Sequence, residues 1–160
     1  DSNTNLNDTY DSPMPTSRIP VLPTATPDYS PTSTPAPTPT TMPESQMRLF
    51  VGRRLYQEGR VQEAIKQYDI SIRLDPAFDE VYNDRGAAYM TLGLYEQAIK
   101  DFDTAIGMEP EAGGFYANRA MAYTLSGMSE AAKRDIDKAA SLGIDREELM
   151  EFINAIKGGG

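Results

Sequence analysis

Two Asp-x-Asp pairs are the residues whose types and spacing come closest to a chemical site. Closely spaced carboxylates are hard oxygen ligands of the kind that hold Ca²⁺. A calcium loop beginning at Asp101 would need a closing glutamate where Ala112 stands, and it would lie across a predicted helix. We therefore interpret both pairs as the solvated face of a helix. They are Asp101-Phe-Asp103 and Asp135-Ile-Asp137.

The residue types that most enzymes depend on are missing. The sequence contains no cysteine and no histidine. This excludes disulfides, thiol nucleophiles and thiolate metal sites, and it removes the commonest general base. No glycine-rich phosphate loop and no serine with a plausible base is present. We predict that the protein is not an enzyme and uses no metal and no cofactor.

The net charge of −9 is shared by both parts of the chain. Residues 1–44 carry one basic and five acidic residues, and residues 45–160 carry 14 basic and 19 acidic residues. Such a chain lacks the cationic surface of a nucleic-acid binder and is repelled by anionic membranes. No apolar run approaches the roughly 18 residues of a membrane span. We predict no nucleic-acid partner and no membrane insertion.

Composition divides the chain near residue 44. Ten of the 12 prolines lie in residues 1–43, and 16 of the first 45 residues are Ser or Thr. Such a segment buries too little apolar surface to offset the entropy of ordering. We predict an extended or disordered tail over 1–44, a globular part over 45–157 and a flexible end over 158–160.

The globular part repeats itself every 34 residues. Every repeated position is small or apolar in all copies, which is a packing pattern. The clearest sets are Gly52, Gly86 and Ala120; Gly59, Gly93 and Gly127; Ala64, Ala98 and Ala132; and Tyr68, Phe102 and Ile136.

Each unit is predicted to be a pair of helices separated by a glycine in the left-handed conformation. Asp145 is expected to cap a seventh helix over 146–157, where apolar residues recur at i, i+3, i+4 and i+7. The predicted first helices are 46–58, 79–92 and 113–126, and the second helices are 61–74, 95–108 and 129–142.

The middle copy resembles the tetratricopeptide repeat (TPR) family. Tyr82, Gly86, Tyr89, Ala98, Phe102, Ala105 and Pro110 fit the pattern W-x2-L-G-x2-Y…A-x3-F…P, although Arg85 and Arg119 take the usual Leu position. The resemblance implies an all-α, right-handed superhelix of seven helices. Its parts would be three repeats (45–78, 79–112 and 113–146) and a capping helix (146–157), with a concave groove for peptides.

Helical angles, at about 100° per residue, predict which side chains line this groove. Family members that bind the carboxylate ends of chaperones use Lys, Arg and Asn at positions held here by Leu49, Arg53, Asp84, Gly114 and Asn118. The resemblance therefore implies that this clamp is absent. We expect an extended or polyproline peptide instead, although the methionines could equally be semi-buried helix residues. The predicted groove residues are Leu49, Arg53, Tyr56, Asn83, Ala87, Met90, Asn118, Met121 and Leu125.

The tail contains an apolar island, Arg18–Pro23, which is either a docking segment or a chance cluster. We expect its residues Ile19, Val21 and Leu22 to enter pockets near Tyr56, Met90, Met121 and Leu125. Its Ser/Thr/Pro-rich stretch predicts either a bare spacer or a glycosylated stalk. The candidate glycan sites are Asn7, in the sequon Asn7-Asp8-Thr9, and Thr32, Thr34, Thr38, Thr40 and Thr41.

Two functions follow as hypotheses. The first is a self-assembling subunit of an extracellular or cell-surface filament, whose tail docks on a neighbouring copy. The second is an envelope-tethered adaptor whose groove binds an extended peptide of another protein. The absence of cysteine, the tail composition and a start at Asp1 favour an extracytoplasmic setting, with the periplasm as the alternative.

Overall fold

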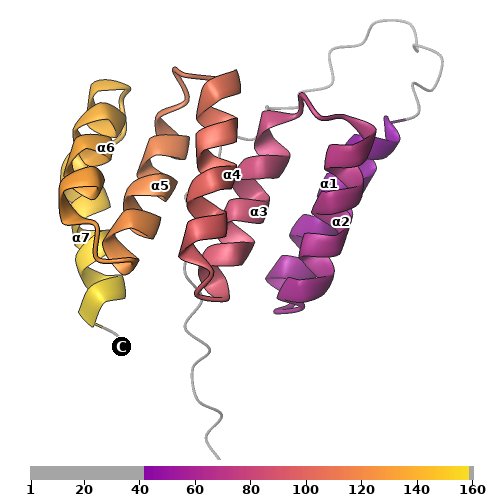
Figure 1. Cartoon of the computed structure of the whole chain (residues 1–160), viewed down its shortest axis with the longest axis horizontal. Coiled ribbons are helices and arrows are strands. Elements are labelled where there is room, and N and C mark those ends of the chain that lie inside the picture. The colour runs from indigo at the N-terminus through magenta and orange to yellow at the C-terminus, as the bar shows by residue number, and fades with distance from the viewer. Residues whose placement is uncertain (1–41, 159–160) are drawn as a thin grey trace, which may run out of the picture.

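The computed structural model describes residues 42–158, and all of their regular structure is helical. The helices stand side by side in chain order (Figure 1). Their bounds are α1 (Glu44–Gln57), α2 (Val61–Leu74), α3 (Asp79–Thr91), α4 (Tyr95–Met108), α5 (Gly113–Leu125), α6 (Ser129–Ser141) and α7 (Arg146–Gly158).

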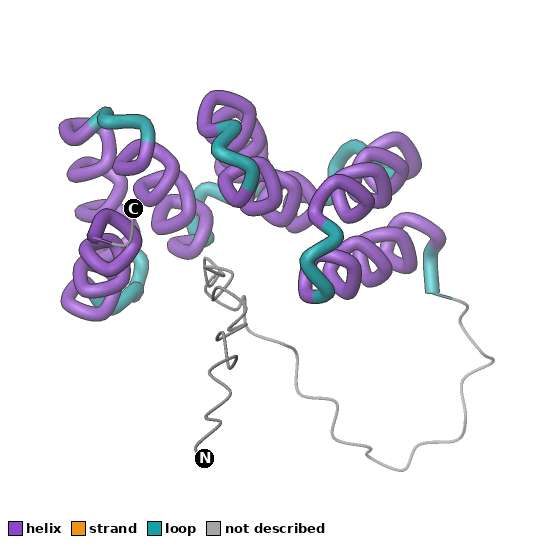
Figure 2. Tube along the Cα trace, turned by 90° about the horizontal axis from the view of Figure 1, so that it is seen from below, coloured by secondary structure: helices purple, strands orange, loops and turns teal. Residues whose placement is uncertain are grey.

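Consecutive helices form three pairs, and each second helix packs against its own first helix and against the first helix of the next pair. Figure 2 shows the pairs following one another along the molecule, with α7 beside the last pair. The predicted helices are all present, with ends within two residues of their expected positions. Helix α1 begins at Glu44, inside the segment predicted as tail.

Glycines end the first helices in the predicted left-handed conformation. The φ angles of Gly59, Gly93 and Gly127 are 79°, 73° and 81°. Each turn is closed by a backbone hydrogen bond, such as that from the Leu94 N–H to the Tyr89 carbonyl at 2.9 Å. Gly143, with φ of 93°, plays the same part after α6. These turns make the two helices of each pair antiparallel.

A small residue of each first helix lies against a bulky side chain of its partner helix. A Cβ atom added at Gly86 would lie 2.7 Å from Cε1 of Phe102. An equivalent atom at Gly52 would overlap the Tyr68 ring. The absence of a side chain at these positions therefore sets how closely the paired helices approach.

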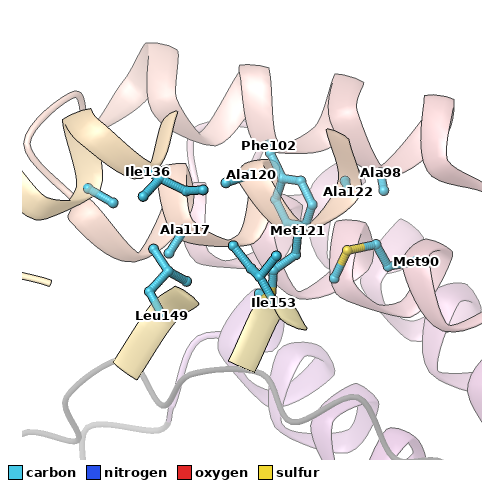
Figure 3. Close-up of a cluster of buried hydrophobic side chains, with 11 residues drawn as sticks. Met90, Ala98, Phe102, Ala117, Ala120, Met121, Ala122, Ile136, Leu149 and Ile153 are labelled. Carbon is cyan, nitrogen blue, oxygen red and sulfur yellow. The ribbon is translucent and has the colours of Figure 1, made fainter. Parts of the chain in front are cut away.

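Helix α7 completes the larger of two hydrophobic clusters. Leu149 and Ile153 of α7 point toward Ala117 and Met121 of α5, as Figure 3 shows. At the start of α7, the Asp145 carboxylate accepts a hydrogen bond from the Glu148 N–H at 2.8 Å, which confirms the predicted cap. The apolar stripe of α7 thus closes the last repeat. No helix among residues 42–158 is long and apolar enough to cross a bilayer.

Arginines bind the repeats together on their outer side. Arg85 of α3 makes two hydrogen bonds to Asp101 of α4, at 2.7 and 2.8 Å, and a third to Asp69 of α2, at 2.6 Å. Its guanidinium lies between the rings of Tyr82 and Tyr89. One side chain therefore joins three helices.

The same arrangement recurs 34 residues later. Arg119 pairs with Asp135 and Asp103 and lies between Tyr116 and Tyr123. Asp101 and Asp135 are buried, so the prediction that the Asp-x-Asp pairs form a solvated face is wrong for these two residues. No cluster that could hold a metal is found among residues 42–158.

Replacing Gly86 by leucine should destabilise the protein strongly. The new side chain would overlap the buried Phe102 ring, which costs about 1–3 kcal/mol or more in the free energy of unfolding. Urea denaturation followed by circular dichroism measures this loss. Gly107→Ala is the matched control, because a Cβ at Gly107 meets no atom within 4 Å and alanine favours a helix. Equal stability of Gly86→Leu and wild type would disprove the close contact.

Replacing Arg85 by leucine should cost about 3–5 kcal/mol, because the buried Asp101 carboxylate loses its bidentate partner. Adding Asp101→Ala removes the unpaired charge and should restore a large part of that stability. Asp103→Ala is the control, since its exposed ion pair should be worth less than about 1 kcal/mol. Denaturation midpoints of the four proteins check this. A double variant that is less stable than Arg85→Leu would contradict the buried-charge argument.

Candidate protein-interaction surfaces

Most of the predicted groove residues belong to the core. Their exposed fractions are at most 4%, and Met90 and Met121 pack in the hydrophobic cluster that α7 completes. The expected tail pockets at these two methionines are therefore wrong. Arg53, Tyr56 and Leu125 are half-buried. The six buried residues are Leu49, Asn83, Ala87, Met90, Asn118 and Met121.

The prediction of groove residues from helical angles was wrong for these six because neighbouring first helices contact one another on the side assigned to the groove. Tyr56 of α1 and Thr91 of α3 form a hydrogen bond at 2.8 Å between their hydroxyls. Met90 is the equivalent of Tyr56 one repeat later, so its side chain also points toward the next first helix. In α5 the same direction is covered by α7.

A charged cluster connects α1 and α3. The Arg53 guanidinium donates to the carboxylates of Asp84, at 2.5 Å, and Glu80, at 2.9 Å. Burial raises the pKa of the Asp84 carboxyl above its ordinary value, although the charge of Arg53 opposes the shift. Arg53 is the basic residue among the predicted groove positions, and its charge is therefore balanced by carboxylates of the domain itself.

Two buried asparagines meet between α3 and α5. The Asn118 amide donates from Nδ2 to Oδ1 of Asn83 at 2.8 Å. Oδ1 of Asn118 has no hydrogen-bond partner among the residues that the structure describes. A buried acceptor without a donor costs free energy, so this contact between α3 and α5 is only partly satisfied among the described residues.

The start of the solenoid presents an uncovered apolar face, which we call the α1 end face and define as Met47, Phe50 and Val51. Positions 47, 81, 115 and 149 are equivalent at the repeat spacing. Val81, Phe115 and Leu149 are 0%, 3% and 2% exposed, whereas Met47 is 51% exposed. Phe50 and Val51 are exposed as well. Within residues 42–158 nothing occupies the place that a preceding repeat takes elsewhere.

Several predicted sites lie outside the described residues and stay predictions. They are the docking residues Ile19, Val21 and Leu22 and the glycan candidates Asn7, Thr32, Thr34, Thr38, Thr40 and Thr41.

Comparison with known families agrees with the geometry. A family model described as TPR repeat matches residues 52–93, and one described as Tetratricopeptide repeat matches residues 80–111. Residues 52–111 of this chain are tetratricopeptide repeats. The chain's all-α TPR superhelix is the predicted fold class. No curated protein sequence matches the chain.

Solved TPR structures resemble this chain over most of their own length. The second TPR of Spaghetti (RPAP3), bound to an HSP90 peptide, is 28% identical with a TM-score of 0.61, covering 62% of this chain and 92% of that one. The second TPR domain of human RPAP3, in complex with an HSP70 peptide, is 26% identical with a TM-score of 0.63, covering 71% and 98%. The TPR2B domain of yeast Sti1, in complex with pHsp70, is 21% identical with a TM-score of 0.65, covering 69% and 94%, and shows the fold alone.

Sequence reasoning missed the α1 end face and the arginine contacts of this TPR domain. Both were visible in the repeat spacing. Met47 occupies a position whose later equivalents are apolar, and Arg85 recurs as Arg119 together with its aspartate partners. Positions that are buried between two repeats become exposed at the ends of the array, where one neighbour is missing.

Asp84→Asn tests the charged cluster through pH. The raised pKa means that the folded state holds the proton of Asp84 more tightly than the unfolded state, so its contribution to stability is lost as pH rises from about 4 through the folded pKa. The neutral variant should therefore be more stable than wild type at pH 7.5, with the difference shrinking toward pH 4.5. Urea denaturation at both values measures it, with the exposed Glu96→Gln as control. A variant less stable than wild type at both pH values would show that the Arg53 ion pair outweighs the burial cost.

Proposed function

We propose that this chain is a non-catalytic, self-assembling scaffold, a subunit of an extracellular filament or surface assembly. The TPR fold supports the general role, because stacked helix pairs present extended surfaces to other proteins. The partners in this proposal are further copies of the chain. The extracytoplasmic setting rests on the Ser/Thr/Pro-rich tail and its candidate glycan sites.

The observation that carries the proposal is the α1 end face. Large apolar side chains that cluster on an exposed surface indicate an interaction site. Met47 stands at a position that later repeats bury against a preceding repeat, and Phe50 and Val51 lie beside it on the same helix face, so the face suits a helical array. Its partner on a second copy would be a different surface, since the other end of the solenoid is made by α6 and α7. Contacts between unlike surfaces that do not close a ring produce filaments.

An adaptor function is the second candidate, and Oδ1 of Asn118 favours it. This acceptor is buried, so a backbone N–H of a bound peptide would reach it only if the side chains that cover it moved aside. The RPAP3 relatives hold chaperone peptides, which supports peptide binding in general. The pairing of Arg53 with Asp84 and Glu80 argues against a peptide held by its terminal carboxylate. An adaptor of this kind would stay monomeric without its peptide.

Replacing the α1 end face tests the proposal. The full-length variant Met47→Ser/Phe50→Ser/Val51→Thr should keep its helical circular dichroism, because all three side chains are exposed. Each fully buried apolar side chain contributes roughly 1.5–3 kcal/mol and about 1.4 kcal/mol is a factor of ten, so self-association should weaken by more than tenfold. Sedimentation velocity over a range of concentrations measures it.

The matched control is Leu74→Ser/Met108→Ser, which removes exposed apolar side chains at the ends of α2 and α4. It should assemble as wild type does. If the wild-type protein remains monomeric at every concentration, the self-assembly proposal is wrong and the adaptor function is favoured.

A further inference from the structure

A groove of about 310 Å³ lies at the C-terminal end of the solenoid, between α6 and α7. Ile136, Ile153 and Met150 give it an apolar floor. In the earlier repeats, a second helix packs beside each first helix. Helix α7 is equivalent to a first helix, because Leu149 corresponds to Phe115 at the repeat spacing. The groove therefore lies at the junction between the second helix α6 and the following first helix α7, which pack less closely than α2 with α3 or α4 with α5.

All charged residues that line this groove are cations: Lys133, Arg146 and Lys157. The chain as a whole has a net charge of −9, so a purely cationic lining is unusual for it. The glutamates of α7 are outside the lining. Arg146 pairs with Asp137, whereas Lys133 and Lys157 form no ion pair among residues 42–158. The groove therefore suits an acidic segment that also carries apolar side chains.

We propose that the groove binds residues 1–14 of a second copy of this chain. This segment contains Asp1, Asp8 and Asp11 and no basic residue. It also carries Leu6, Tyr10 and Met14, which suit the apolar floor. Charge and hydropathy of the segment thus complement those of the groove. The inference rests on the proposed self-assembly. It assigns the tail an acceptor site other than the predicted pockets at Met90 and Met121, which are buried.

Position favours a second copy as the source of the segment. The groove lies at the α7 end of the solenoid, and the tail joins the domain at the α1 end (Figure 1). In a head-to-tail array, the α7 end of one copy adjoins the α1 end of the next, where the tail of that next copy begins. Residues 15–41 could span on the order of 80 Å in polyproline form, so they readily cross this junction. The α1 end face and the groove then belong to one continuous interface.

A charge swap between two full-length variants tests the inference. One variant is Lys133→Glu/Lys157→Glu and the other is Asp8→Lys/Asp11→Lys. Alone, each should self-associate at least tenfold more weakly than wild type at low salt, because groove and segment carry like charges. An equimolar mixture should assemble again, because each tail then meets a groove of opposite charge. Sedimentation velocity measures all three samples, and Lys66→Glu/Lys100→Glu is the control for exposed lysines elsewhere.

The outcomes separate this inference from the proposed function. If both variants assemble alone as wild type does, the groove is not the acceptor, while self-assembly stands. If both are weak alone and the mixture does not recover, the segment does not bridge two copies, and the inference is overturned. Wild-type protein that never self-associates would overturn the proposed function and this inference together. Helical circular dichroism of each variant shows that the domain is folded.

Discussion

The contact between a small residue and a bulky side chain inside each helix pair determines the rest of the molecule. At Gly86 the Phe102 ring occupies the space that a Cβ would need, so the side chain of α4 packs directly against the backbone of α3. The glycine turns fix the direction in which the chain returns. A pair built in this way still has an apolar face on each side, because one hairpin cannot bury both. Stacking of further pairs is therefore required for stability.

Ion pairs between repeats stabilise this stacking, and the first repeat lacks the arginine that makes them. Arg85 and Arg119 each join their own pair to the preceding one, and in the first repeat the equivalent position holds Val51. The first helix thus has no arginine to offer a preceding pair and presents exposed apolar side chains instead. At the other end α7 packs on the last pair and leaves a cationic groove between itself and α6. The two ends differ in chemistry, and this difference is what suits a polar, head-to-tail assembly.

The fold was predictable because it depends on local rules repeated at a constant spacing. Small residues, glycine turns and the Asp145 cap were each readable from residue type and position. The groove was not, because exposure depends on neighbouring helices: Met90 and Met121 have suitable helical angles but are covered by adjacent first helices and α7. The prediction that Asp101 is solvated was wrong for the same reason, because a neighbouring helix covers it. A carboxylate that looks solvated in one helix is buried once Arg85 reaches it from another.

Electron microscopy of the purified full-length chain tests the central claim, that the unlike ends of this solenoid join copy to copy. Head-to-tail joining should give fibres with one uniform repeat along their length, which grow longer as protein concentration rises. Separate particles of single-chain size at every concentration would contradict it.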